Sequence, residues 1–361
     1  MNELERCRAE IDRIDTEMAK LFEERMRVCH AVADYKRANA LPVYDEAREN
    51  AILASKASRV ADVELQPYYV DFMKDVMKTS RRYQSALLEG VKVAYSGAEG
   101  AFGYMAAKKA FPMATLVPFA DFEGAYRAVE KGECDTAVLP IENSFAGDVG
   151  MVMDLLFSGS LYVNRIVEVE VAHNLLGVKG ASLEGIKRVV SHPQALEQCD
   201  EFIRRSGFET VAYSNTALAA KYVNELGDPE VAAIASDDAA DIFGLVPLAK
   251  GINEARNNTT RFAVLSAAQV LPNPQSRDEN EHFILLFTTR NEAGALAKCL
   301  NIIGAHDFNM RNLRSRPMKE LLWNYYFFVE AEGNVATESG QDMLRELSAV
   351  CARLKLGGTY R

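Results

Sequence analysis

Residues 161–178 read LYVNRIVEVEVAHNLLGV, a long passage rich in the β-branched residues that strands favour. On either side of it, short β-type runs alternate with helical stretches, which is typical of an α/β fold with largely parallel sheets. Because the passage interrupts this alternation midway, we expect it to cross between two lobes that leave a cleft between them. The short runs lie at 91–96, 114–119, 136–141, 188–192, 209–214 and 231–236.

Toward the N-terminus, residues 1–89 contain no glycine and only two prolines, Pro42 and Pro67. They lack the residues that interrupt helices, so we expect an all-helical domain. The first helix would be about 55 Å long, and two shorter helices cannot cover it in a monomer. Its apolar stripe should pair with a second copy, which predicts a homodimer and leaves tetramers open. The stripe comprises Leu4, Ile11, Ile14, Met18, Leu21, Val28 and Val32. The expected helices span 3–39, 45–58 and 62–88.

Toward the C-terminus, the polar stretch LPNPQSRDENE at 271–281 contains two prolines and is interpreted as a linker. Beyond it we expect the strand–helix–strand–strand–helix–strand order of a ferredoxin-like domain. Its elements should lie near 282–289, 294–306, 308–316, 323–331 and 340–353, followed by a short final strand. The fold class is therefore multidomain: all-α at 1–89, two-lobed α/β at 90–270 and α+β at 280–361.

Bulk composition excludes several classes of protein. A net charge of −10 argues against a general nucleic-acid binder, which needs a basic surface. The six cysteines show no CxxC spacing and the histidines no paired spacing, so we expect neither a metal site nor a redox pair. The charged N-terminus does not resemble a signal peptide, and no apolar run reaches the roughly 20 residues of a membrane helix. We expect a cytoplasmic protein.

The helical segment carries a set of polar residues at helical spacing. Arg25 and Lys36 are eleven residues apart, so both project from one face of the first helix, whereas Arg8 lies roughly 100° away from Arg25. Two further groups share faces at spacings of three and four, and solvated surface charge is the alternative interpretation of each residue alone. These groups are Asp45, Arg48 and Glu49, and Ser80 with Gln84.

Taken as a set, these residues resemble the all-helical chorismate mutase family over nearly all of residues 1–89. Chorismate is a dicarboxylate whose rearrangement to prephenate needs no nucleophile, and arginine binds carboxylates through a planar two-point fork. The resemblance implies that Arg25 and a partner subunit's copy of Arg8 bind the carboxylates. It also implies that Lys36 and Gln84 donate to the ether oxygen. The ring hydroxyl would be held by Asp45 and Glu49, with Arg48 and Ser80 in support.

Three polar motifs follow or open strands of the α/β segment. They are PIENS at 140–144, SHPQAL at 191–196 and NTTRF at 258–262. Ligands in α/β sheets bind at the carboxyl ends of strands, and helix starts suit anions. Each motif alone has a plainer interpretation, namely a helix cap for the first two and an ordinary strand residue for Thr260.

Together the three motifs resemble the prephenate dehydratase family over roughly residues 91–270. GAEG at 97–100, the segment FEGAYRAVEKGECDTAVLPIENS and SNTALAA at 214–220 add to the match. The resemblance implies a two-lobed fold similar to periplasmic binding proteins and a reaction that needs no cofactor, because aromatisation drives it. It implies that Thr260 donates a proton to the departing hydroxyl, although Thr259 beside it leaves the choice of threonine open. Substrate would be positioned by Glu142, Asn143, Ser144 and Gln194, with Arg261 as a carboxylate anchor.

The sequence departs from this family where Ala101 and Gly103 stand at positions that commonly carry hydroxyl residues. Substrate affinity should then be weaker or be supplied by another group.

Residues 280–361 resemble the ACT regulatory domain through GAL at 294–296, RNLRSRP at 311–317, Trp323, Tyr325 and FFVE at 327–330. In dehydratases this domain binds phenylalanine and inhibits the enzyme, and a packing module that supports a dimer is the alternative. Arg314 stands where the family has an acidic residue, which should change ligand preference or weaken feedback. Gly294 should allow a ligand close to the backbone.

The combined resemblance is to bifunctional chorismate mutase/prephenate dehydratases. It implies an isomerase and carbon–oxygen lyase of phenylalanine biosynthesis that converts chorismate to prephenate and then to phenylpyruvate. Two alternatives remain: an amino-acid-responsive binding protein with one or both sites inactive, or an enzyme that prefers arogenate.

Overall fold

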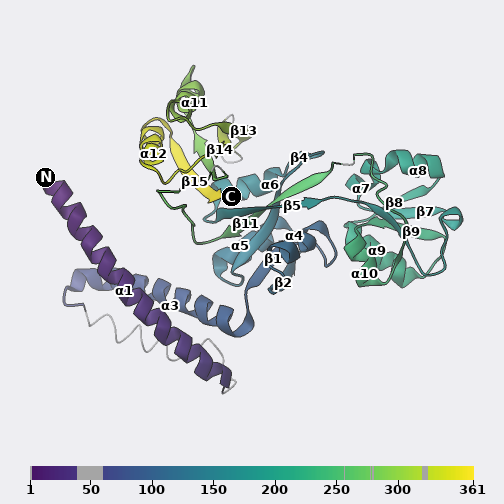
Figure 1. Ribbon diagram of the computed structural model, residues 1–361, viewed down its shortest axis with the longest axis horizontal. Helices are drawn as coiled ribbons and strands as arrows, with labels where there is room; N and C mark the ends of the chain where they lie inside the picture. Colours follow the sequence, from purple (N-terminus) through teal and green to yellow (C-terminus); the bar gives the residue numbers. More distant parts are fainter. Residues whose placement is uncertain (1, 39–59, 256, 277, 279, 319–323) are drawn as a thin grey trace. The chain divides into compact units, whose positions relative to one another are not determined.

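We describe a computed structural model of the chain over residues 2–38, 60–255, 257–276, 278, 280–318 and 324–361. It divides into two compact units, Met1–Lys92 and Val93–Arg361 (Figure 1). No helix of these described ranges is both long and apolar enough to cross a membrane.

The described part of the first unit is helical, as the absence of glycine predicts. Helix α1 spans Glu3–Ala38, a short 3₁₀ turn spans Val63–Leu65, and α3 spans Gln66–Glu89 and packs against α1. Pro67 stands in the first turn of α3, where a missing N–H costs nothing. The helix predicted at 45–58 lies outside the described residues.

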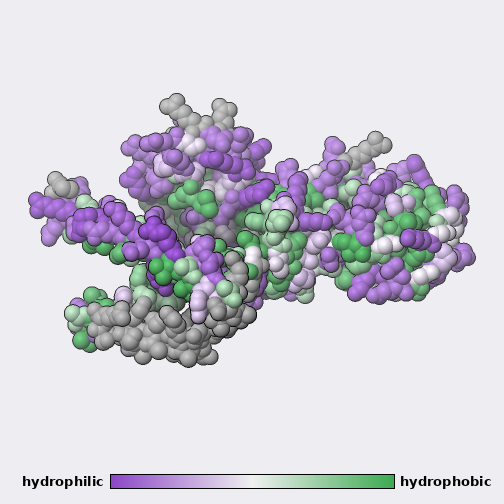
Figure 2. Space-filling model, turned by 60° about the horizontal axis from the view of Figure 1, so that its bottom comes forward, coloured by the Kyte–Doolittle hydropathy of each residue, from purple (hydrophilic) through white to green (hydrophobic). Residues whose placement is uncertain are grey.

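The apolar stripe of α1 lies on the surface of this chain. Its seven residues are all exposed, from Val32 at 38% to Leu21 at 64%. The face of α1 visible in Figure 2 is mainly hydrophilic, and the apolar stripe lies on a different face, so the helix is amphipathic.

The second unit contains two sheets, each forming the centre of one lobe. The first lobe has the strand order β5-β11-β3-β1-β2, with β4 paired to β3. Its strands are β1 (Lys92–Ser96), β2 (Thr115–Phe119), β3 (Thr136–Asn143), β4 (Gly147–Asp148), β5 (Tyr162–Glu170) and β11 (Thr259–Ser266). Its helices are α4 (Phe102–Ala110), α5 (Phe122–Lys131) and α6 (Gly150–Ser158).

The second lobe has the strand order β10-β6-β9-β7-β8. Its strands are β6 (Asn174–Gly177), β7 (Arg188–Ser191), β8 (Glu209–Ala212), β9 (Val231–Ala235) and β10 (Val246–Ala249). Its helices are α7 (Pro193–Gln198), α8 (Asp200–Ser206), α9 (Thr216–Leu226) and α10 (Asp237–Phe243). The chain enters this lobe between β5 and β6 and returns between β10 and β11, so the predicted crossing of 161–178 is confirmed (Figure 1).

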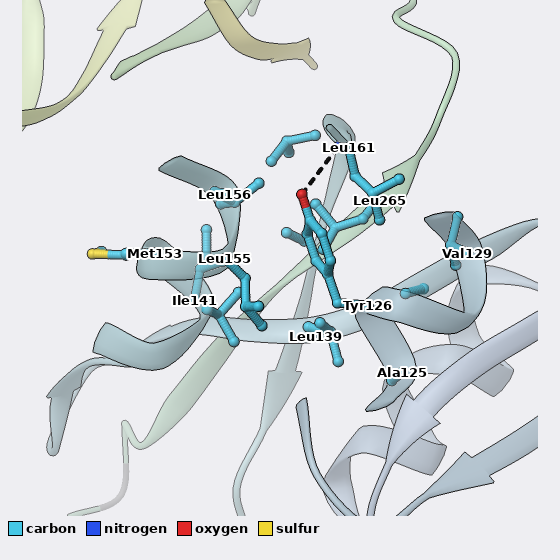
Figure 3. Packing of buried hydrophobic residues seen from close by; sticks show 14 of the residues in the cluster. Ala125, Tyr126, Val129, Leu139, Ile141, Met153, Leu155, Leu156, Leu161 and Leu265 are labelled. Carbon is cyan, nitrogen blue, oxygen red and sulfur yellow. Dashed lines mark hydrogen bonds between the residues drawn. The ribbon is translucent and has the colours of Figure 1, made fainter. Parts of the chain in front are cut away.

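The core of the first lobe fixes the strand that carries the PIENS motif. Leu139 and Ile141 of β3 are buried against Leu155 and Leu156 of α6, beside Tyr126 of α5 (Figure 3). The Tyr126 hydroxyl accepts a hydrogen bond from the backbone N–H of Leu161 at 2.9 Å, so that its polar end is satisfied inside the core.

The C-terminal segment has the predicted ferredoxin-like order of elements. They are β12 (His282–Thr288), α11 (Ala295–Ala305), β13 (Met310–Pro317), β14 (Tyr325–Glu332), α12 (Glu338–Val350) and β15 (Arg353–Tyr360). Its strand order β13-β14-β12-β15 continues into the first lobe, because β15 pairs in parallel with β5 at Gly358 and Val163. Any side chain at Gly358 would collide with the Val163 backbone, and its φ of 146° also favours glycine.

Candidate active sites

In the helical unit, α1 and α3 bring together Arg25 and Ser80. The Arg25 guanidinium donates a hydrogen bond to the Ser80 hydroxyl, which itself donates to the Val76 carbonyl oxygen at 2.7 Å. Gln84 lies one turn beyond Ser80 on α3 and is buried at 8% exposure. Its Oε1 has no hydrogen-bond partner in the described residues, which is unusual for a buried amide.

The other residues predicted for this site are not brought together with Arg25 and Ser80 in the described part of the chain. Lys36 is half-buried near the end of α1, and Arg8 is exposed and is not brought to Arg25. Asp45, Arg48 and Glu49 lie outside the described residues.

In the second unit, a cavity of about 640 Å³ separates the two lobes. Its walls include the ends of strands and the starts of helices from both lobes, as expected for an α/β sheet. Of the residues predicted for this site, Asn143, Gln194 and Thr260 line it.

Thr260 and Asn143 are register partners on β11 and β3, and both are buried at 8% exposure. Asn143 Nδ2 donates to Thr260 Oγ1 at 2.8 Å. Asn143 Oδ1 accepts from the backbone N–H groups of Phe145 and Ala146, at 3.0 and 2.8 Å. Since a backbone N–H can only donate, these contacts fix the orientation of the Asn143 amide.

Glu142 and Arg261 are not among the residues that line the cavity, so the structure does not bring them to the predicted substrate contacts. Successive side chains of a strand point to opposite faces, and these two follow the face opposite to Asn143 and Thr260. Arg261 donates to Glu142 Oε2 at 3.0 Å, to both carboxylate oxygens of Glu330 at 2.6 and 3.0 Å, and to the Tyr360 hydroxyl at 3.0 Å. Burial opposes charge on Glu330, yet Arg261 holds the pKa of this carboxyl below its ordinary value.

Ser144 also takes a structural place instead of the predicted contact with substrate. Its hydroxyl donates to the Asn257 carbonyl oxygen and accepts from the Thr259 N–H, both at 3.0 Å. It therefore ties the loop after β3 to the start of β11.

On the opposite lobe, the cap interpretation of SHPQAL is confirmed, and the motif also reaches the cavity. His192 Nδ1 accepts from the Gln194 N–H at 3.3 Å and caps α7, and Gln194 lines the cavity. Asn215, in the SNTALAA stretch, caps α9 and also lines the cavity.

Three polar residues near the cavity were missed by the sequence interpretation: His173, Gln198 and Asn258. All are buried, at 2%, 6% and 1% exposure. A signal for two of them was present. Gln198 follows Gln194 by one helical turn, and His173 stands directly before an apolar strand, where a buried imidazole needs a polar partner.

The two departures from the family pattern have physical consequences here. A Cβ at Gly103 would lie 2.6 Å from the Ser96 carbonyl oxygen, so this backbone leaves no room for a hydroxyl side chain. Ala101 precedes α4 without a side-chain cap. Because Ala101, Phe102 and Gly103 line the cavity, this uncapped helix start lies at the cavity wall.

Arg314 joins the C-terminal module to the rim of the cavity. It donates from Nε to Asp148 Oδ2 at 2.6 Å and from Nη2 to Glu142 Oε1 at 3.3 Å. Asp148 lines the cavity, so the positive charge at position 314 meets two acids of the first lobe.

Comparisons with known proteins agree with this architecture. The chorismate mutase type II family model matches residues 7–85 and the prephenate dehydratase model residues 93–270. A bifunctional chorismate mutase/prephenate dehydratase of Neisseria gonorrhoeae is 33% identical over 97% of this chain and 94% of its own. Arogenate dehydratase/prephenate dehydratase 2 of Arabidopsis thaliana is 35% identical over 75% of this chain and 72% of its own.

A crystal structure of prephenate dehydratase in complex with L-Phe from Arthrobacter aurescens superposes with a TM-score of 0.69 at 28% identity. The match covers 75% of this chain and 89% of that chain. With both family models matched in order and a relative similar over nearly the whole length, the chain belongs to the bifunctional chorismate mutase/prephenate dehydratase family of phenylalanine biosynthesis.

Proposed function

We propose that the cavity between the two lobes is where prephenate is dehydrated and decarboxylated, with Thr260 as proton donor. The observation that supports this most directly is the Asn143–Thr260 hydrogen bond. Because Thr260 Oγ1 accepts from Asn143, its own O–H is left to donate, and no acceptor for it is found in the described residues. The hydroxyl is therefore poised to donate to a ligand in the cavity.

The reaction requires one proton at one oxygen. The bond between the ring and its hydroxyl breaks with the electron pair on oxygen, and the departing hydroxide takes a proton to become water. The bond to the ring carboxylate breaks as CO₂, and its electron pair completes the aromatic ring. A donor fixed beside the departing oxygen is the contribution that the protein has to make.

The substrate carries two carboxylates, yet neither Arg nor Lys is among the described residues that line the cavity. We propose that backbone N–H groups at the start of α4 meet this charge, since a helix start without a side-chain cap favours anions. Gln194 and Asn215 supply polar contacts from the other lobe.

For the mutase reaction we propose a site built around Arg25, Lys36, Ser80 and Gln84. Arg25 would bind a carboxylate, and the amide nitrogen of Gln84 and the Lys36 ammonium would donate to the ether oxygen of chorismate. The Arg25–Ser80 contact and the buried Gln84 amide support this placement. Charge that develops on the breaking ether oxygen is then stabilised by donors already in position.

We further propose that α1 pairs with α1 of a second copy, so that a partner's Arg8 completes the mutase site. The exposed apolar stripe supports this, because burying it against a second copy would contribute hydrophobic free energy that the monomer lacks.

We expect the protein to sediment at no less than twice the 40.0 kDa of one chain. The double substitution Leu21→Glu and Val28→Glu should lower mutase activity and leave prephenate turnover intact. Val63→Glu, at an exposed residue outside α1, is the control. Sedimentation of the wild-type protein as a monomer would contradict the pairing.

The C-terminal module is proposed to be an ACT domain that senses phenylalanine, with domain boundaries at 1–89, 90–270 and 280–361. Its sheet continues into the first lobe, and Phe157 of α6 stacks on Tyr326 of β14 with ring centroids 4.2 Å apart. Arg261 of β11 pairs with Glu330 of β14, and Arg314 of β13 pairs with Glu142 and Asp148, so ionic contacts join the module to strands that end at the cavity. A ligand that shifts this module can thus act on β3 and β11.

A time course with chorismate tests the two activities and the sensor together. Without added cofactor, the purified chain should form prephenate and then phenylpyruvate. Millimolar phenylalanine should slow the second step about tenfold, in the range of typical allosteric coupling, while prephenate accumulates. Phenylpyruvate formation that is flat across the phenylalanine titration would remove the sensor, and absence of phenylpyruvate would favour a protein with an inactive dehydratase site. A higher rate with arogenate than with prephenate would favour the arogenate alternative.

A further inference from the structure

Hydrogen bonds connect Thr260 to His173 through buried amides of both lobes. Asn143, which donates to Thr260, also donates from Nδ2 to Asn258 Oδ1 at 2.7 Å. Asn258 Nδ2 donates to Gln198 Oε1 at 3.1 Å, and His173 Nε2 lies 2.8 Å from the same oxygen. All five side chains are at most 8% exposed. Hydrogen bonds between buried side chains hold those side chains in place, because breaking one would leave a polar group unpaired.

The direction of every bond in this network follows from one fixed amide. The backbone donors at Phe145 and Ala146 identify Oδ1 of Asn143, so its Nδ2 must face Asn258. Asn258 must then present its oxygen to Asn143 and its nitrogen to Gln198. Gln198 presents an oxygen, which only accepts, so the proton of the His173 imidazole is on Nε2. The opposite ring nitrogen, Nδ1, therefore carries a lone pair.

His173 Nδ1 is a buried acceptor without a partner in the described residues. The side chain is 2% exposed, lies where β5 leads into β6, packs edge-on against Phe102, and lines the same cavity as Thr260. Burial lowers the pKa of His173 below its ordinary value, and the hydrogen bond to Gln198 opposes this only in part, so the ring is neutral at physiological pH. A buried acceptor of this kind calls for a donor, and the described part of the chain does not provide one.

We propose that His173 Nδ1 accepts a hydrogen bond from the ring hydroxyl of prephenate and so selects the orientation in which that oxygen faces Thr260. The inference rests on the proposed dehydration site. Prephenate has two carboxylates, a ketone and one hydroxyl, and this hydroxyl is its only hydrogen-bond donor at neutral pH. Bound to His173, the oxygen keeps a lone pair for the proton of Thr260. The network thus holds His173, the hydrogen-bond acceptor, at one end and Thr260, the proton donor, at the other, and both act on the ring hydroxyl of prephenate.

Two substitutions separate this role from a structural one. His173→Asn can place an amide oxygen near the position of Nδ1 while losing the bond to Gln198. His173→Gln can keep a donor near the position of Nε2 while losing the acceptor. We expect His173→Gln to lower kcat/KM for prephenate about 100-fold, within the range of positioned proton-transfer groups, and His173→Asn to retain most of it. Inhibition by phenylpyruvate, which lacks the ring hydroxyl, should be equal in both variants and in the wild type.

The opposite order of activities, or a parallel loss of phenylpyruvate binding in both variants, would assign His173 a structural role and overturn the proposal. Far-UV circular dichroism and inhibition by phenylpyruvate report whether the second unit of each variant, which contains position 173, is folded. If both variants unfold, nitrogen NMR of the wild-type imidazole decides. We expect the Nε2–H tautomer in the free protein and a shift of Nδ1 on binding prephenate, and a proton on Nδ1 would refute it. The Thr260→Val variant distinguishes failure of the His173 proposal from failure of the proposed dehydration site, because full activity of this variant would disprove the dehydration site itself.

Discussion

Replacing Thr260 by valine should abolish phenylpyruvate formation while prephenate still accumulates from chorismate. Valine keeps the shape of the side chain and removes only the hydroxyl. Asn143 keeps Asn258 as an acceptor at 2.7 Å, so the loss is confined to the proton donor. We expect kcat for prephenate to fall about 1,000-fold, within the range of general acid catalysis.

Two matched variants sharpen this test. Thr260→Ser retains a hydroxyl and should recover most of the activity, whereas Thr259→Val removes the neighbouring hydroxyl on the opposite face of β11 and should have little effect. Initial rates with supplied prephenate, compared at saturation, give the kcat ratio directly. Normal turnover by Thr260→Val together with loss in Thr259→Val would move the donor to Thr259.

Most of the architecture could be predicted because it rests on local patterns. The absence of glycine before Gly90 predicted the described helices of the first unit, and alternation of short apolar runs located most strands of both lobes but not β10. The expectation of largely parallel sheets was wrong, because β6 and β11 run antiparallel to both of their neighbours. The pairing of strands that are distant in sequence could not be predicted from local patterns. The sequence does not show that β15 joins β5, because that contact depends on Gly358 meeting a strand almost two hundred residues earlier.

The sequence analysis identified which motifs reach the cavity, but it did not distinguish the side chains on the cavity face of each strand from those on the opposite face. Residues of PIENS and NTTRF line the cavity, but Glu142 and Arg261, which were assigned to substrate together with their neighbours, do not. If Thr260 faces the cavity, the two-residue period of a strand sends Arg261 away from it, and the sequence alone is enough to apply this rule. The tautomer of His173 was beyond reach, since it depends on amides that are distant in sequence.

The second large effect should come from Lys36→Ala, which we expect to remove chorismate mutase activity and leave prephenate dehydration unchanged. The rearrangement involves no proton transfer, so its rate depends on stabilising the charge that develops on the ether oxygen. Loss of the Lys36 cation beside that oxygen removes stabilisation that water does not replace. A decrease in mutase kcat of at least about 100-fold is expected. Lys74→Ala on α3 is the matched control, because Lys74 forms an exposed pair with Asp71 that contributes little.

The two half-reactions must be assayed separately on the same preparation, with chorismate and with supplied prephenate. Intact dehydration then shows that the second unit is folded, and an unchanged helical circular dichroism signal shows the same for the helical unit, so that a silent mutase step reflects the loss of Lys36 itself. Arg25→Ala should give the same pattern with a larger increase in KM, since this residue is proposed to bind a carboxylate in the ground state as well as the transition state. Near-wild-type mutase turnover by Lys36→Ala would mean that the catalytic cation lies elsewhere on the helical unit, and the site around Arg25, Ser80 and Gln84 would have to be abandoned.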